Sequence, residues 1–231
     1  MHTFTMSYRE MFAEDEWYHC FTRGIDKRDT FKDGNDGDRF IQQLYLSNTN
    51  KSLHRSNLGK KTISEIFSIN LVDQFVAIGA FCLMPNHFHL ILKPIVDKGV
   101  SRYMQKLGTA YTRYFNIKYE RTGGLFVSPF RAKHLHTDLY FQHALQYVHC
   151  NPAELFEPKW KEGVVRDLPQ LKKKLLGYTY SSFGTFNDPH HVLRKLIHPS
   201  TFQVETQSDP NTILENAREY YEELHQGEAL M

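Results

Sequence analysis

The chain has 231 residues, of which 41% are hydrophobic and 23% charged, and a formal net charge of +2. This composition is typical of a soluble globular protein, and the charge is too small to indicate a strongly basic nucleic-acid-binding domain, so any basic surface must be local. The sequence shows no signal peptide and no apolar run long enough to span a membrane, and its three cysteines form no C-x-x-C pair. We therefore expect a cytoplasmic protein without a disulfide framework or a zinc knuckle.

The first predicted elements are a strand and a helix. Residues 16–24 mix aromatic and polar side chains in a strand-like way, and Gly24 ends the run. Asp36-Gly37-Asp38 is a candidate cap for a helix that continues through Tyr45, where the apolar residues form one stripe. A polar connection follows, with a short helix predicted over residues 62–69.

A β-hairpin is predicted next, and it carries two histidines. The apolar runs 75–84 and 87–95 flank Pro85-Asn86, which has turn chemistry. Since side chains at i and i+2 of a strand share a face, His87 and His89 would stand side by side while Phe88 points into the core. With 13 histidines in the chain, roughly 0.7 His-x-His pairs arise by chance, so spacing alone is weak. A buried strand that places polar groups at two such positions does so at a cost, which favours a functional role over accident, and two neighbouring imidazoles could form half of a metal site.

Residues 100–119 form the clearest predicted helix. A stripe that includes Tyr103, Tyr111 and Tyr114 is expected to pack into the core. A neighbouring row is basic and is either a solvated face or a surface that follows a phosphate backbone. This row consists of Arg102, Lys106 and Arg113.

The second half of the chain is predicted to be mainly helical. One or two short strands broken at Pro129 lead into a helix over residues 139–150, which Thr137-Asp138 can cap and which Pro152 ends. Tyr140, His143, Tyr147 and Asn151 line one face of that helix. A final helix is expected from Asp209-Pro210 to about His225, with residues 205–208 as a flexible join.

Four segments together resemble one family, the single-tyrosine HUH transposases, and within it the REP-associated tyrosine transposases. The four segments occur in the family's order, and they are Tyr18-His19-Cys20-Phe21-Thr22-Arg23-Gly24, Cys82-Leu83-Met84-Pro85-Asn86-His87-Phe88-His89-Leu90, Tyr111-Thr112-Arg113-Tyr114-Phe115-Asn116 with Gly124-Leu125-Phe126 after it, and Tyr147-Val148-His149-Cys150-Asn151-Pro152. The resemblance implies an α+β fold, with a ferredoxin-like or RRM-like antiparallel sheet and packed helices. The matching segments span roughly residues 16–155, and we expect a transposase domain over residues 1–187. The region after it matches no family motif, and we expect a C-terminal extension with a terminal helix over residues 188–231.

The resemblance implies a reaction as well. Tyr147 would attack a phosphodiester bond of single-stranded DNA and form a 5′-phosphotyrosine, while His87 and His89 would hold a divalent metal, Mg²⁺ or Mn²⁺. Asn151 lies one helical turn after Tyr147 and would add a carbonyl oxygen as third ligand. No other tyrosine of the chain has an amide side chain one turn downstream.

The expected partner is single-stranded DNA at a hairpin-forming repeat or a transposon end, and the expected location is the cytoplasm, with the nucleoid. Candidate DNA contacts are the basic row and three further cations, Arg23, Arg131 and Lys133. No membrane partner is expected, and a monomer is favoured over a homodimer.

Two other functions remain open. The chain could be a noncatalytic RRM-like protein that binds single strands on aromatic side chains, although a pure binder has no reason to keep both histidines, the tyrosine and the asparagine. A replication or conjugation initiator would use the same residues, but such proteins often carry further domains.

Overall fold

The computed structural model describes residues 12–53, 55–203 and 210–226, and its centre is one antiparallel sheet. Four strands form it in the order β2-β3-β1-β4. They are β1 (Tyr18–Arg23), β2 (Val76–Met84), β3 (His87–Pro94) and β4 (Arg131–His134). Because β2 and β3 form the predicted hairpin and β1 lies between β3 and β4, the sheet has the ferredoxin-like order that the sequence predicted.

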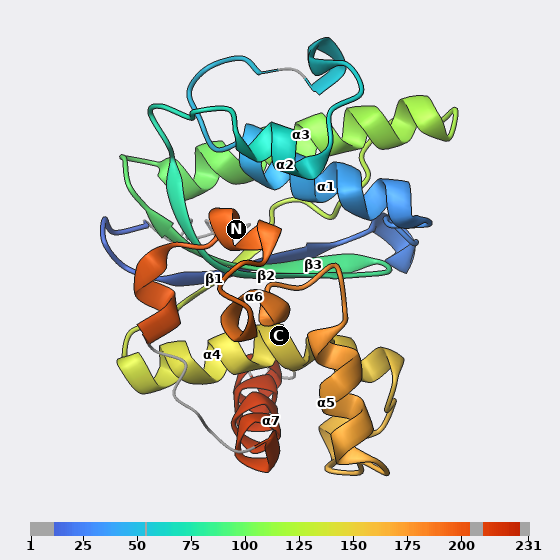
Figure 1. The fold of residues 1–231 in the computed structure, drawn as a ribbon, viewed down its shortest axis with the longest axis vertical. Coiled ribbons are helices and arrows are strands. Elements are labelled where there is room, and N and C mark those ends of the chain that lie inside the picture. The colour runs from blue at the N-terminus through green and yellow to red at the C-terminus, as the bar shows by residue number, and fades with distance from the viewer. Residues whose placement is uncertain (1–11, 54, 204–209, 227–231) are drawn as a thin grey trace, which may run out of the picture.

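Helices cover both faces of the sheet (Figure 1). On one side lie α1 (Gly34–Leu46), α2 (Ile63–Phe67) and α3 (Gly99–Lys118). On the other side lie α4 (Asp138–Cys150), α5 (Leu168–Leu176), α6 (Phe183–Asn187) and α7 (Pro210–Gln226). Short 3-10 turns connect them at Ile25–Lys27, Arg55–Leu58, Asn151–Leu155, Trp160–Glu162, Val192–Leu196 and Pro199–Gln203.

The two faces of the sheet build two separate apolar cores. Tyr18, Cys20, Phe88 and Leu90 pack under α1 and α3, together with the buried tyrosines of α3, so the predicted core stripe of that helix is confirmed. The alternate residues of the strands, such as Ile91 and Cys82, pack under α4 and α7. Side chains that alternate along β3 therefore enter different environments, and the two histidines of β3 point to the side of α4.

The cap of α1 differs from the prediction. The N-cap is Asp33, whose carboxylate accepts a hydrogen bond from the Asp36 amide at 3.0 Å. Asp36 itself is buried and accepts hydrogen bonds from Lys118, Tyr114 and Tyr119 of α3 or the residue after it. The predicted cap residue thus ties α1 to α3, and the capping role belongs to the carboxylate three residues earlier.

The other predicted elements agree with the structure to within a few residues. The strand predicted around Pro129 is β4, and Gly24 forms an isolated bridge with Phe126 before it. The predicted join at 205–208 and the cap at Asp209 lie outside the described residues. The boundary at residue 187 stays a prediction, and α7 beyond it contributes Leu214, Ala217 and Tyr220 to the core under α4. No described helix has the length and apolarity that crossing a bilayer requires.

Candidate active site

The two predicted metal-ligating histidines lie side by side at the start of β3. Their ring centroids are 5.0 Å apart and the rings are nearly perpendicular. His89 is only 4% exposed, whereas His87 is half-buried and contacts Asn86 Oδ1 through its Nδ1 at 2.6 Å. Burial lowers the pKa of His87 to about 4 and the pKa of His89 well below its usual value. Both imidazoles are therefore neutral near pH 7, which is the form that binds a metal ion.

Helix α4 brings Tyr147 and Asn151 to the same place. The helix begins where the Thr137 hydroxyl accepts a hydrogen bond from the Tyr140 amide, as predicted, and its apolar stripe packs against the sheet. The Tyr147 ring meets the His89 ring edge-on, with centroids 5.4 Å apart. Asn151 follows the last residue of the helix and is completely buried. The structure thus joins the residues that the sequence placed in one catalytic site.

Unpaired polar atoms mark the space between these residues. His89 Nε2 and both polar atoms of the Asn151 amide are buried, and none has a hydrogen-bond partner among the described residues. The Asn151 amide lies within reach of Tyr147 and His87 without forming a hydrogen bond of good geometry to either. Burial is the main cause of the raised pKa of Tyr147 and the lowered pKa of His87, and the hydrogen-bonding influence of Asn151 opposes it in both cases. Buried polar groups normally have partners, so this cluster fits a group that supplies one.

The donor set suits a divalent cation. No three His, Cys, Asp or Glu side chains gather as an ion site in the described ranges, so an ion here would need the Asn151 oxygen beside the two imidazoles. Two nitrogens and one neutral oxygen leave positions open for water and phosphate, which suits Mg²⁺ or Mn²⁺ in a catalytic site. The residues that are present therefore fit the metal that the resemblance implies.

A third histidine belongs to the site and was not predicted. His19 of β1 is completely buried, and its Nε2 lies 2.9 Å from His89 Nδ1. Its Nδ1 lies 2.9 Å from the hydroxyl of Tyr220, which α7 contributes. His19 is part of the first matching segment, and the sequence signal was its position on a strand with one polar face. The contact with α7 had no sequence signal.

Helix α7 also covers Tyr147. The rings of Tyr220 and Tyr221 lie 5.4 and 6.2 Å from the Tyr147 ring, and Tyr147 is 3% exposed. Burial raises the pKa of Tyr147 above its usual value of 10. The phenol is therefore protonated at neutral pH and needs a nearby positive charge to become a nucleophile.

Three of the candidate DNA-binding cations share the face of the sheet that carries the site. Arg23 pairs with His87 across β1 and β3, and its charge contributes to lowering the pKa of His87, after burial. Arg131 pairs with Phe21, and Lys133 pairs with His19, across β1 and β4. Directly paired residues of antiparallel strands point to the same face, so all three project on the side of α4. All three are exposed.

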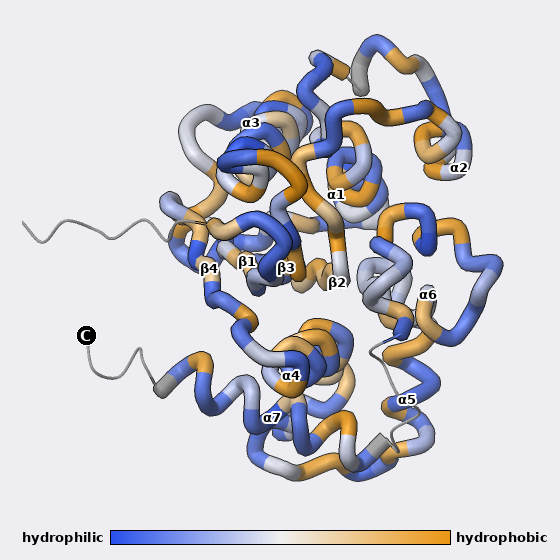
Figure 2. The backbone as a smooth tube through the Cα atoms, turned by 90° about the vertical axis from the view of Figure 1, so that its left-hand side faces the viewer, coloured by the Kyte–Doolittle hydropathy of each residue, from blue (hydrophilic) through white to orange (hydrophobic). Residues whose placement is uncertain are grey.

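The other three cations lie on α3, across the sheet from α4 (Figure 2). Arg102 donates to Asn50 Oδ1 at 3.0 Å, and Lys106 donates at 2.6 Å to the carbonyl oxygens of Thr49 and Lys51. These two side chains hold the segment after α1 against α3, while Arg113 is exposed. A role of this row in DNA binding stays a prediction.

The remaining histidines near the motifs make structural contacts. His149 points away from the site and contacts Ser182 Oγ at 3.0 Å. His143 lies 3.7 Å from Glu219 of α7, and His134 lies 3.2 Å from Glu16.

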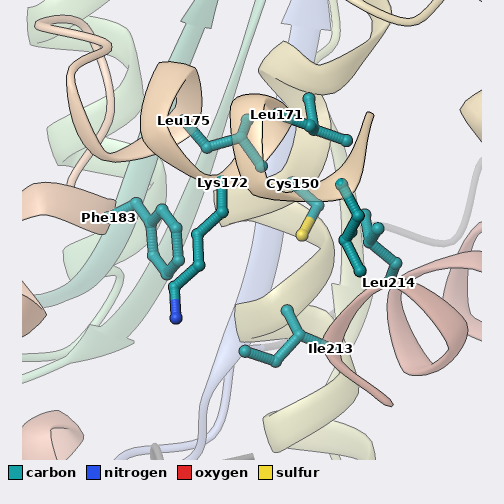
Figure 3. A pocket seen from close by; sticks show the side chains of 8 residues that line it. Cys150, Leu171, Lys172, Leu175, Phe183, Ile213 and Leu214 are labelled. Carbon is teal, nitrogen blue, oxygen red and sulfur yellow. The ribbon is translucent and has the colours of Figure 1, made fainter. Parts of the chain in front are cut away.

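A small gap between α4, α5 and α7 is separate from the site. Cys150, Leu171, Leu175, Phe183, Ile213 and Leu214 surround it (Figure 3). Its volume of about 20 Å³ is close to that of one water molecule, and its lining is almost entirely apolar. Lys172 also lines this gap, which has no room for a ligand larger than about one water molecule.

Comparison with known proteins bears on the family and the fold of the chain. Residues 44–151 match the family model described as IS200-like transposase. A search among curated proteins finds no significant relative. A solved structure of a REP-associated tyrosine transposase bound to a REP hairpin has a similar fold, with a TM-score of 0.51 and 14% identity, over 89% of this chain and 93% of that one.

Proposed function

We propose that the chain, whose residues 44–151 match the family model described as IS200-like transposase, is a metal-dependent transesterase of single-stranded DNA. The observation that carries the proposal is the position of Tyr147, which lies edge-on to His89 beside unpaired His89 Nε2 and Asn151 amide atoms. Buried polar atoms normally have partners, so three beside Tyr147 that have none among the described residues support a group bound between them.

In the proposed reaction, the Tyr147 oxygen attacks a backbone phosphorus atom. The bond from phosphorus to the tyrosine oxygen forms, and the bond from phosphorus to the 3′-oxygen breaks. The phenol loses its proton and the leaving 3′-oxygen gains one, so the products are a 5′-phosphotyrosine and a free 3′-hydroxyl. Attack by a 3′-hydroxyl on the phosphotyrosine is the reverse step and rejoins DNA without a nucleotide cofactor. A divalent metal held by His87, His89 and Asn151 would neutralise charge on the phosphate oxygens.

The proposed substrate is a single strand next to a hairpin. The solved structure of similar fold holds a REP hairpin, and this chain presents Arg23, Arg131 and Lys133 on the face of its own site. Arg23 is the best placed to contact a phosphate at the metal site, because it pairs with His87. Cations of this kind hold the backbone in register without reading its sequence.

The test is formation of a covalent adduct on a 5′-labelled or 3′-labelled oligonucleotide that carries a hairpin. We expect an adduct that survives denaturing electrophoresis with Mn²⁺ and is absent with EDTA, and only the label downstream of the cut remains on the protein. An adduct in the Tyr147→Phe variant, or one that forms equally well in EDTA, would contradict the proposal.

The alternative, a noncatalytic RRM-like binder, has less support. Such proteins stack bases on an open face of the sheet. Here Phe88 and Tyr18 are buried under α1 and α3, and the opposite face is covered by α4 and α7. Within the described residues, the sheet therefore offers no open row of aromatic side chains on which bases could stack.

A further inference from the structure

Three side chains from distant parts of the chain form a hydrogen-bonded line that ends at the candidate metal site. His89 Nδ1 contacts His19 Nε2, and His19 Nδ1 contacts the Tyr220 hydroxyl, both at 2.9 Å. All three residues are buried, with exposed fractions of 4% or less. The opposite end of the line is His89 Nε2, which has no partner among the described residues and faces the site.

If His89 binds a cation, the donor and the acceptor in each hydrogen bond of this line are fixed. A metal takes the lone pair of Nε2, so the proton of the neutral His89 ring must be on Nδ1. His89 Nδ1 then donates to His19 Nε2, and because His19 is also neutral, its own proton is on Nδ1. His19 Nδ1 donates in turn to the Tyr220 oxygen. Both imidazole protons in this arrangement therefore have an acceptor.

If each hydrogen bond of the line runs the other way, His89 cannot be a ligand. If Tyr220 donated to His19 Nδ1, His19 Nε2 would donate to His89 Nδ1, and the His89 proton would sit on Nε2. A ring in that form cannot coordinate a metal through the atom that faces the site. The position of the protons along this line therefore decides whether His89 is a ligand.

We propose that His19 is a positioning residue, which holds His89 in the tautomer that presents a bare Nε2, and that Tyr220 anchors His19 in this role. The inference rests on the proposed function and extends it to the C-terminal helix. Metal-binding histidines usually donate their second N–H to a fixed acceptor, and loss of that acceptor typically weakens metal binding about 10- to 100-fold. Here the acceptor is another imidazole, whose orientation is set by a residue 201 positions further along the chain.

The experiment compares His19→Leu, which removes the acceptor, with His19→Gln, which keeps an acceptor and a donor at a similar reach. Mn²⁺ binding is measured by calorimetry, and the His89 tautomer is read from ¹⁵N NMR shifts of the metal-free protein. We expect His19→Leu to weaken Mn²⁺ binding about 10- to 100-fold and to move the His89 proton to Nε2. His19→Gln should retain the Nδ1–H tautomer and bind Mn²⁺ within about threefold of the wild type, and Tyr220→Phe should fall between the two.

Two results would overturn the inference. One is a His89 that already carries its proton on Nε2 in the metal-free wild type. The other is equal Mn²⁺ affinity of His19→Leu and wild type. If the wild type still forms the Tyr147 adduct in either case, only the role of His19 is wrong; if the wild type neither binds Mn²⁺ nor forms the adduct, the proposed function fails with it.

Discussion

Because its buried amide is unpaired, replacing Asn151 with an apolar residue should stabilise the fold and weaken the proposed metal site. Asn151 is completely buried, and neither of its polar atoms has a partner among the described residues. An unsatisfied buried polar group costs about 1–3 kcal/mol, and an apolar side chain of the same shape avoids that cost. We therefore expect Asn151→Leu to raise the free energy of unfolding in EDTA by about 1–3 kcal/mol, or roughly 2–4 °C in melting temperature per kcal/mol.

Asn48 is the matched control, because it is also a buried asparagine but a fully paired one. Its Oδ1 accepts from the Phe75 and Val76 amides at 3.0 Å, and its Nδ2 donates to the Val76 carbonyl at 2.8 Å. Asn48→Leu leaves three backbone groups at the start of β2 without partners. We expect it to lower the free energy of unfolding by about 3 kcal/mol or more, the opposite sign to Asn151→Leu.

Urea denaturation followed by circular dichroism measures both variants, first in EDTA and then in Mn²⁺. A ligand at 100 times its Kd stabilises the folded state by about 2.7 kcal/mol. In Mn²⁺ at about 100 times its Kd, the free energy of unfolding of the wild type should rise by that amount, and that of Asn151→Leu should rise by less. The stability advantage of Asn151→Leu over the wild type in EDTA should therefore shrink or change sign in Mn²⁺. If Asn151→Leu destabilises the protein in EDTA as strongly as Asn48→Leu does, Asn151 is a structural residue and the reasoning is wrong.

Three further outcomes follow from the contacts. Tyr147→Phe should abolish the covalent adduct on a hairpin oligonucleotide while Tyr180→Phe retains it, and the melting temperatures should show that both variants are folded. Arg23→Ala should reduce the slope of DNA affinity against salt concentration by about one unit, and Arg102→Ala should leave it unchanged. An equal reduction of the slope in Arg102→Ala would show that the basic row of α3 also contacts DNA. Hydrogen bonds from Lys118 and its neighbours outweigh burial and lower the pKa of Asp36, so they stabilise the fold above the unfolded pKa of about 3.8, and this stability is lost as the pH falls through the folded pKa. Denaturation at pH 7 should therefore show a loss of about 3–5 kcal/mol in Asp36→Asn, and a wild-type-like value would contradict this account.

Much of the fold was predictable because its signals are local. The hairpin, the tyrosine stripe of α3 and the Thr137 cap of α4 each depend on residues close together in the sequence, and the structure confirms them. The capping role of Asp36 was wrong for a nonlocal reason. Two aspartates compete for the start of α1, and the choice depends on Lys118, which is 82 residues away in the sequence.

The candidate site divides in the same way. His87 and His89 share a motif, and Tyr147 and Asn151 are one helical turn apart, so local spacing places the members of each pair together, while the roles predicted for them came from the family resemblance. The contact of His19 with Tyr220 joins β1 to the last helix, and no pattern in the sequence indicates it.

The basic residues show the same limit. A helical wheel predicted the row on α3, whereas the common face of Arg23, Arg131 and Lys133 depends on the pairing of β1 with β3 and β4.

Because side chains alternate along β3, the strand register that fills the apolar core also places the two candidate ligands on the side of α4. His87 and His89 point to α4, while Phe88 and Leu90 fill the opposite core. A slip of one residue against β1 would reverse both sets at once, with two imidazoles pressed into the apolar layer beneath α3 and a phenylalanine facing Tyr147. A chain in the wrong register would therefore lose the candidate ligand pair and the packing of the sheet together, so the register that fills the core is also the one that assembles the proposed site.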